Sequence, residues 1–276
     1  MPDPHDSAFY PYGGLKPAAG TSGSPPSRAA STGLAASQPI PAAGTASRCL
    51  NVTDPTLRTQ ADFDRLAALD DAGWDHNRHY HAFLLRHLTR DRSIALEVGC
   101  GTGAFARALA RHFRRVTAID LSPEMVRRAR DLSAAVDNVE FRQADIRTFD
   151  LPPAAYDCIA TLATLHHLPM EETLARLGAA LRPGGVLLVL DLYRPATLVD
   201  RGWSASAAVV STLLRAWKVR RLRPPPHVRR AWAEHARHDV YPTLAEVHSL
   251  AERLLPGASV RRHLLWRYSL VWRRRV

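Results

Sequence analysis

The chain has 276 residues, 46% of them hydrophobic, and a formal net charge of +11, which is enough for one globular domain of ordinary size with extensions. No run of 18 apolar residues is present, so we expect no transmembrane helix, and the first residues lack the basic start and apolar core of a secretory signal. The three cysteines have no metal-ligand spacing and are typical of free thiols, so the composition predicts a cytoplasmic protein.

Residues 1–48 are rich in Pro, Ala, Gly and Ser and show no apolar periodicity. Such a segment cannot bury enough apolar surface to offset the entropy lost on ordering. We therefore expect a disordered tail over residues 1–48, followed by one domain over residues 49–276. Apolar residues at helical spacing predict helix within residues 61–89.

Alternating strands and helices are expected in the centre of the chain. Apolar runs predict strands at 94–98, 115–120, 138–143, 156–162 and 185–192. Helices are expected at 104–112, 123–134 and 170–181. This alternation predicts an α/β fold with a parallel sheet and helices on both faces.

The end of the chain has a different pattern. Residues 243–254 predict a helix, and residues 258–273 hold two extended stretches with no helix between them. Two strands so close in sequence pair antiparallel if they pair at all. We therefore expect an antiparallel hairpin at the end of a mostly parallel sheet.

A glycine-rich motif, Leu-Glu-Val-Gly-Cys-Gly-Thr-Gly, occupies residues 96–103. It lies between an expected strand and an expected helix, as in nucleotide-binding sites. Gly99, Gly101 and Ala104 satisfy the relaxed dinucleotide pattern, so NAD is one alternative. Glu97, however, brings a carboxylate to the site, which would repel a pyrophosphate but would accommodate an ammonium or a sulfonium group.

The motif resembles motif I of the class I S-adenosylmethionine (SAM) methyltransferases, and the resemblance covers about residues 60–192. Four later segments resemble that family in order and spacing, namely 116–123, 143–146, 156–162 and 181–185. The resemblance implies SAM as the cofactor and a Rossmann-like, doubly wound, seven-stranded sheet that ends in an antiparallel hairpin.

The resemblance also implies cofactor-binding roles. Asp120 would accept both ribose hydroxyls, Asp145 would accept from the adenine amino group, and Tyr80 would cover the methionine end of SAM. A turn or capping role for each aspartate and a core position for Tyr80 are the alternatives. The other residues expected to contact the cofactor are Glu97, Gly99, Cys100, Gly101, Gly103, Leu121, Met125, Ile146 and Thr161.

His166 and His167 follow the expected strand at 156–162. Methyl transfer needs a base only if the acceptor must lose a proton, and His166 is the candidate for that role, with a structural His-His-Leu segment as the alternative. The upstream histidines lack a carboxylate or cysteine partner at a firm spacing, so we expect no metal site. They are His76, His79, His81 and His87.

Positive charge is concentrated in residues 193–276, which hold 17 basic and 5 acidic side chains. Apolar residues at helical spacing over 203–217 precede a basic run that ends at 223, within an expected helical insertion at about 195–240. Three interpretations stay open: a lid over an apolar substrate, an amphipathic helix on a membrane surface, or a packed helix with solvated arginines. No recognisable RNA-binding module accompanies the arginines, so we do not expect a nucleic-acid partner.

Together these features predict SAM-dependent methyl transfer to a small-molecule acceptor. An apolar or lipid-like molecule is one class of acceptor that fits them. An RNA methyltransferase and a non-catalytic SAM-binding protein are the alternatives.

Overall fold

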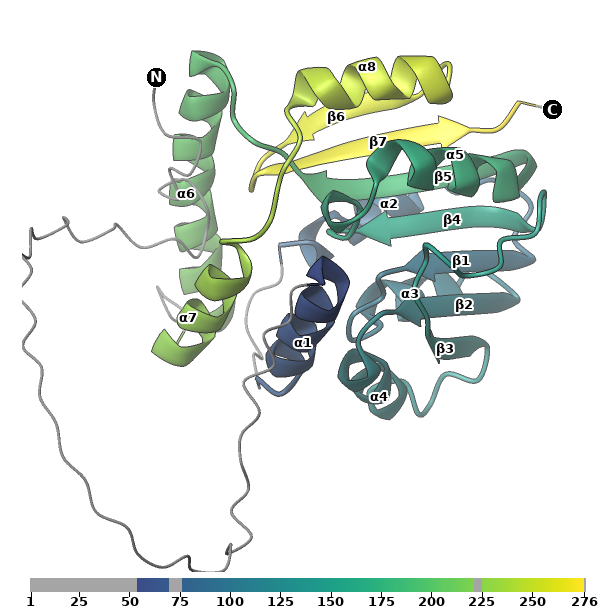
Figure 1. Ribbon diagram of the computed structural model, residues 1–276, viewed down its shortest axis with the longest axis horizontal. Helices are drawn as coiled ribbons and strands as arrows, with labels where there is room; N and C mark the ends of the chain where they lie inside the picture. The colour runs from purple at the N-terminus through teal and green to yellow at the C-terminus, as the bar shows by residue number, and fades with distance from the viewer. Residues whose placement is uncertain (1–53, 70–75, 221–224, 276) are drawn as a thin grey trace, which may run out of the picture.

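The computed structural model describes residues 54–69, 76–220 and 225–275, and its centre is a seven-stranded sheet (Figure 1). The strand order is β3-β2-β1-β4-β5-β7-β6. The first five strands in this order are parallel, whereas β7 pairs antiparallel with both β5 and β6. The expected Rossmann-like sheet with an antiparallel C-terminal hairpin is thus confirmed.

The strands follow the predicted apolar runs closely. They are β1 (Ile94–Val98), β2 (Arg115–Asp120), β3 (Val139–Gln143), β4 (Tyr156–Leu162), β5 (Leu181–Leu192), β6 (Ser259–His263) and β7 (Arg267–Arg273). The main difference is β5, which begins at Leu181 and not at residue 185. Leu181 pairs with Tyr156 ahead of a register shift in β4, so the strand includes the turn residues expected to precede it.

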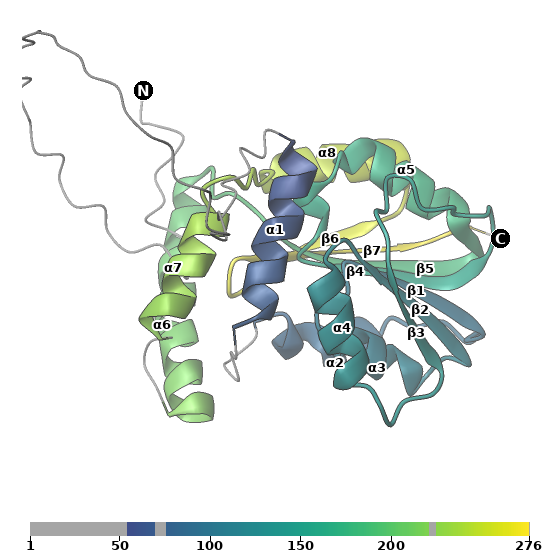
Figure 2. The same ribbon diagram turned by 60° about the horizontal axis from the view of Figure 1, so that its bottom comes forward.

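Helices cover both faces of the sheet (Figure 2). The helices are α1 (Pro55–Ala67), α2 (His81–Leu85), α3 (Ala104–Ala110), α4 (Pro123–Asp131), α5 (Met170–Ala180), α6 (Leu198–Val219), α7 (Pro226–His235) and α8 (Leu244–Leu254), with short 3₁₀ turns η2 (Arg78–Tyr80) and η3 (Leu165–His167). One buried cluster joins the sheet to α2, α3 and α4, and a second joins it to α5 and α8. Both faces of the sheet are therefore buried, as expected for an α/β fold.

Local sequence explains where the helices begin. Ser122 caps α4 by accepting a hydrogen bond from the amide of Met125, and Pro123 occupies the first turn. The helices expected at 104–112 and 123–134 end two or three residues earlier than predicted, in turns. Within 61–89, the structure shows the end of α1 and the short η2 and α2, while residues 70–75 lie outside the described residues.

Three helices form a cap beyond the carboxyl ends of the parallel strands. In Figure 1, α1 and α7 lie side by side next to these strand ends, and α6 lies above α7 at the same side of the molecule. The insertion expected at about 195–240 corresponds to α6 and α7, while the tail over residues 1–48 lies outside the described residues. None of the helices in the described ranges is both long and apolar enough to cross a membrane.

Candidate active site

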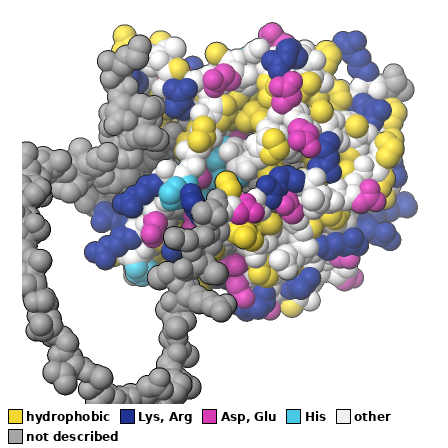
Figure 3. Space-filling model, viewed as in Figure 1, with side chains coloured by type: hydrophobic (Ala, Val, Ile, Leu, Met, Phe, Trp, Pro, Cys, Tyr) yellow, Lys and Arg dark blue, Asp and Glu magenta, His cyan; other side chains and the backbone are white. Residues whose placement is uncertain are grey.

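A cavity of about 660 Å³ lies where the carboxyl ends of β1, β2 and β4 meet the cap. This is the point at which the strand order reverses direction, where open α/β sheets bind their ligands. We call the part of the cavity that is lined by the glycine-rich motif the first lobe. The part that is lined by α1, α7 and a group of histidines is the second lobe. Figure 3 shows histidine side chains reaching the surface on the face that carries α1 and α7.

The glycines of the motif have distinct roles. Gly99 has φ +71°, and a Cβ there would lie 2.0 Å from Oγ1 of Thr164, so only glycine lets these segments approach. Gly101 has φ +51°, and a Cβ there would meet no atom within 4 Å. The backbone at Gly101 is therefore open to a ligand. Gly103 caps α3, and a Cβ there would collide with the ring of Phe141.

Glu97 is a buried carboxylate on the cavity wall. Its Oε2 has no hydrogen-bond partner among the described residues. Burial, and then the charge of Asp120, raise the pKa of Glu97 well above its usual range. A buried carboxylate oxygen without a partner is costly, so this atom is suited to receive a cationic group of a ligand.

Asp120, the last residue of β2, is held at the same lobe by two backbone amides. Its Oδ2 accepts from the amide of Gly101 at 2.8 Å, and its Oδ1 accepts from the amide of Ser122 at 2.9 Å. Burial nevertheless raises the pKa of Asp120. Each oxygen keeps a further lone pair, so the carboxylate can also accept from ligand hydroxyls.

In the second lobe, His166 is held by Asp191, the penultimate residue of β5. The carboxylate of Asp191 accepts from Nδ1 of His166 at 2.6 Å and from the His166 amide at 2.9 Å. In the neutral tautomer that donates from Nδ1, Nε2 of His166 carries a lone pair, and this atom lies 3.9 Å from Oδ2 of Asp239.

His167 and His235 approach the same carboxylate. Nδ1 of His167 lies 3.3 Å from Oδ1 of Asp239, and Nε2 of His235, the last residue of α7, lies 3.7 Å from Oδ2. The other ring nitrogen of His235, Nδ1, faces Asp62 of α1 at 3.2 Å. Burial first, and then the neighbouring histidines His166 and His235, lower the pKa of His167 to about 2, so its imidazole is neutral.

Comparisons with known proteins agree with this geometry. A family profile described as a methyltransferase domain matches residues 95–185. An uncharacterized methyltransferase of Mycobacterium tuberculosis is 34% identical over 207 residues, which cover 74% of this chain and 98% of the relative. This chain belongs to the class I SAM-dependent methyltransferases. A ubiquinone biosynthesis O-methyltransferase of Xanthomonas campestris is 32% identical over 149 residues, covering 49% of this methyltransferase and 62% of the relative.

Solved structures share the fold of the methyltransferase. The N-methyltransferase NodS from Bradyrhizobium japonicum, in complex with S-adenosyl-L-homocysteine, has a TM-score of 0.52 at 22% identity and covers 78% of this chain and 98% of its own. A Haloferax volcanii putative methyltransferase, in complex with the Trm112 activator, has a TM-score of 0.56 at 17% identity with the same coverage.

The first lobe fits the cofactor of this methyltransferase, which is SAM. The unpartnered oxygen of Glu97 suits the ammonium group, the open backbone at Gly101 permits close approach, and Asp120 has acceptors for hydroxyls. The structure brings most of the predicted cofactor residues to this cavity. These are Glu97, Gly99, Cys100, Gly101, Asp120, Leu121, Met125, Asp145 and Ile146.

Asp145 has a partner that the sequence did not reveal. Its carboxylate pairs with the guanidinium of Arg147, with 2.6 Å between Oδ2 and Nη2, and this contact lowers the pKa of Asp145. An adenine amino group would have to share the carboxylate with Arg147. The role expected for Asp145 therefore stays a prediction.

Three predicted cofactor residues lie outside the cavity lining. Tyr80 is buried in the core, and η2 directs it toward the β6–β7 loop. Its hydroxyl donates a hydrogen bond to the carbonyl of Leu264. This position agrees with the alternative of a core tyrosine. Gly103 supports the packing of α3 and does not line the cavity. Thr161 is 1% exposed within β4, where both faces of the sheet are covered.

Sequence reasoning missed the partners of His166. Asp191 follows the apolar run of β5 just as Asp120 follows that of β2, and this repeated pattern could have indicated it. His235 and Asp239 are four residues apart, a spacing that places two side chains on one side of a helical segment.

Proposed function

We propose that this methyltransferase transfers the methyl group of SAM to an oxygen or nitrogen atom of a small apolar or lipid-like acceptor. The observation that carries the proposal is that the histidine cluster and the Glu97–Asp120 lobe line one cavity. Bound SAM supplies an electrophilic methyl group. The residues of the chain hold the two ligands in position, and positioning supplies much of the acceleration in such a transfer.

The lining of the second lobe supports an apolar body for the acceptor. Phe63 and Leu66 of α1 and Trp232 of α7 contribute apolar surface to the cavity. The ring of Phe63 also lies edge-on to that of His235, with 4.8 Å between the ring centroids. An acceptor in this lobe would therefore place an apolar part against the cap and a polar group against the histidines.

His166 remains our candidate base. Its Nδ1 is occupied by Asp191, so proton uptake would use Nε2, which points toward Asp239. The Asp191 carboxylate would stabilise the imidazolium that forms. An oxygen acceptor is also in keeping with the Xanthomonas relative, whose name describes an O-methyltransferase.

An exposed apolar face on α6 supports delivery of a lipid-like acceptor from a membrane surface. Six large hydrophobic side chains of α6 are exposed: Leu198, Val199, Trp203, Val209, Leu213 and Trp217. Basic residues such as Lys218 and Arg220 lie at the end of the helix, as in interfacial helices that bind anionic lipids. On its inner side, Ser211 of α6 bonds to His76, which lines the cavity.

Transfer of a labelled methyl group tests the proposal. The full chain is incubated with methyl-labelled SAM and, separately, with hydroxylated or amine-bearing lipids, small polar acceptors, or RNA. We expect label in the extracted lipid fraction, and less label with the Asp120→Ala variant when SAM is limiting. Label in RNA alone would favour an RNA methyltransferase, and SAM binding without transfer to any acceptor would favour a non-catalytic protein.

A further inference from the structure

We propose that His166, His167 and Asp239 form a binding site for a first-row divalent transition metal such as Zn²⁺ at the acceptor end of the cavity. His235 lies beside this site, with its Nε2 3.7 Å from Oδ2 of Asp239, and is not itself one of the three proposed ligands. The histidines that sequence reasoning considered as ligands are different ones, upstream of the glycine-rich motif. The site is assembled from η3 and the loop that follows α7.

The spacing of the donor atoms fits one metal ion. The ligand atoms of His166, His167 and Asp239 all lie within 4.8 Å of one another. The carboxylate of Asp239 is 3.3 Å from His167 and 3.7 Å from His235. Zinc–nitrogen and zinc–oxygen bonds of about 2.1 Å put tetrahedral ligands about 3.4 Å apart, so only small side-chain adjustments are needed.

The orientation of two imidazole rings supports metal binding more strongly than the distances between donor atoms do. Nδ1 of His166 is bonded to Asp191, and Nδ1 of His235 faces Asp62. Both rings therefore present Nε2 to Asp239. Histidine ligands in metal sites almost always donate their other ring nitrogen to a carboxylate or carbonyl, which fixes the tautomer and the ring orientation.

A single general base would not need this arrangement. One histidine with one carboxylate is sufficient for proton uptake, and His166 with Asp191 already provides that pair. Such a base needs neither the second pair, His235 with Asp62, nor the approach of His167 Nδ1 to within 3.3 Å of Asp239. A metal ion would use His166, His167 and Asp239 at one point, with Nε2 of His235 facing the same Asp239 carboxylate.

The donor set also selects the class of metal. Imidazole suits Zn²⁺, Fe²⁺, Ni²⁺ and Cu²⁺, whereas Mg²⁺ and Ca²⁺ prefer oxygen ligands. His166, His167 and Asp239 line the cavity, and three protein ligands leave the fourth tetrahedral position to face the acceptor. With a metal bound, Nε2 of His166 would be a ligand and not the base, and an acceptor hydroxyl on the metal would lose its proton to water more readily. This alternative to the base role of His166, unlike metal binding itself, rests on the proposed function.

Metal binding is tested with the metal alone. The full chain, without a histidine tag and stripped with a chelator, is titrated calorimetrically with Zn²⁺ and with Mg²⁺, and Co²⁺ serves as a spectroscopic probe of coordination. We expect one Zn²⁺ per chain and no comparable binding of Mg²⁺. Asp239→Ala and His167→Ala should each weaken Zn²⁺ binding at least tenfold, and Asp191→Asn should weaken it about 10- to 100-fold.

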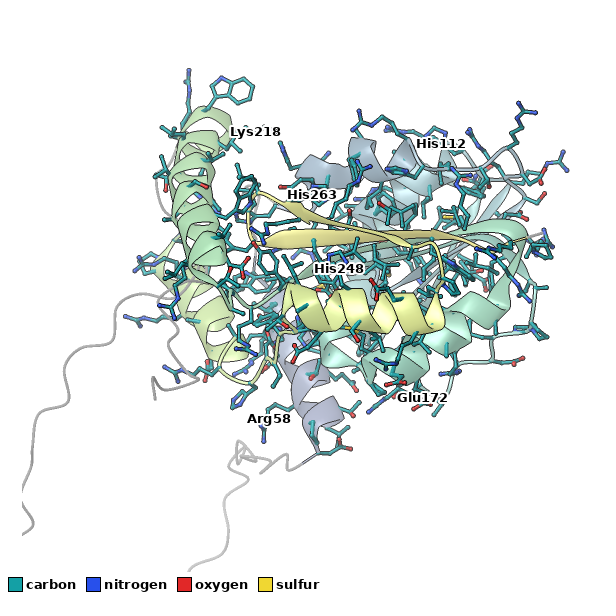
Figure 4. All side chains as sticks on the ribbon, turned by 90° about the horizontal axis from the view of Figure 1, so that it is seen from above. Arg58, His112, Glu172, Lys218, His248 and His263 are labelled. Carbon is teal, nitrogen blue, oxygen red and sulfur yellow. The ribbon has the colours of Figure 1, made fainter. Side chains whose placement is uncertain are left out.

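Matched controls use His112→Ala and His248→Ala, which remove exposed histidines outside the cavity lining (Figure 4). Both variants should bind Zn²⁺ as the natural chain does. Circular dichroism checks the fold of each variant, and His167→Gln replaces any alanine variant that does not fold. Equal Zn²⁺ affinity in the natural chain and in the Asp239 and His167 variants, or no stoichiometric binding at all, would overturn the site.

Two further outcomes separate this proposal from the proposed function. Stoichiometric Zn²⁺ binding with no methyl transfer to any small acceptor would refute the function and leave the metal site intact. Full methyl transfer by the metal-stripped enzyme, with a single pH-dependent step that is lost in His166→Ala, would refute a catalytic role for the metal and support His166 as the base.

Discussion

The backbone amide of Gly101 donates a hydrogen bond to Oδ2 of Asp120, with 2.8 Å between the two atoms. This bond ties the glycine-rich motif after β1 to the end of β2. Asp120 also accepts from the amide of Ser122, so it fixes the start of α4 as well. The residue expected to bind the ribose is thus also the residue that shapes the loop around it.

Replacement of Asp120 should therefore weaken SAM binding through both roles. We expect Asp120→Ala to reduce the free energy of SAM binding by about 1–3 kcal/mol. Asp120→Asn should lose less, because its amide oxygen can still accept from Gly101. Isothermal titration calorimetry measures both, with exposed Asp131→Ala as the control. Unchanged affinity in Asp120→Ala would argue against the ribose role.

Glu97 should make SAM affinity and stability respond to pH in opposite directions. The pKa of Glu97 is raised in the folded state. The contribution of its carboxyl group to folding stability is therefore fully present at pH values below the unfolded-state pKa. That contribution is lost as the pH rises through the folded-state pKa. SAM carries an ammonium group that favours the ionised carboxylate. Its affinity should therefore increase over the same pH window, with release of a proton from Glu97.

The variant Glu97→Gln tests this coupling. It should flatten the pH dependence of thermal unfolding above the unfolded carboxyl pKa and should weaken SAM binding by about 1.5–3 kcal/mol, since a charged hydrogen bond is lost. Calorimetry in buffers of different ionisation enthalpy counts the released proton. A natural chain that binds SAM without proton release at every pH at which it is folded would contradict the assignment.

The cofactor lobe was predictable because its residues lie at strand ends and turns that local patterns reveal. Glu97, Gly101 and Asp120 are each set by a strand or a glycine in their own segment. The acceptor lobe was not predictable in this way. Asp62, His166 and Asp239 come from distant parts of the chain and meet only after the cap packs on the sheet.

Tyr80 is a second residue whose position depends on long-range packing and not on local sequence. Its position upstream of the motif suggested a cover for SAM, but the short η2 directs its side chain into the core instead. This direction depends on the contact of the Tyr80 hydroxyl with the carbonyl of Leu264 in the β6–β7 loop. No periodicity within residues 61–89 specifies that contact.

His76 should make the cap sensitive to acid. Burial lowers its pKa to about 3, and its Nε2 lies 2.9 Å from the hydroxyl of Ser211 on α6. Because the folded pKa lies below the unfolded value of 6.5, the unfolded chain binds more protons between these values, and stability is lost as pH falls from about 6.5 toward 3. His76→Gln should reduce this loss in thermal unfolding, whereas exposed His112→Gln should not.

The apolar face of α6 should bind anionic membranes without contributing to the stability of the fold. Leu213 and Trp217 are 63% and 77% exposed, so the double variant Leu213→Ser, Trp217→Ser should change the free energy of unfolding by less than about 0.5 kcal/mol per site. It should, however, lower co-sedimentation with phosphatidylserine vesicles at least tenfold, since burial of such side chains contributes about 1.5–3 kcal/mol each. The control is Leu57→Ser, Val240→Ser, which removes exposed apolar side chains outside α6. Equal loss of vesicle binding in both double variants, or binding that does not depend on anionic lipid, would show that α6 is not the membrane-facing element.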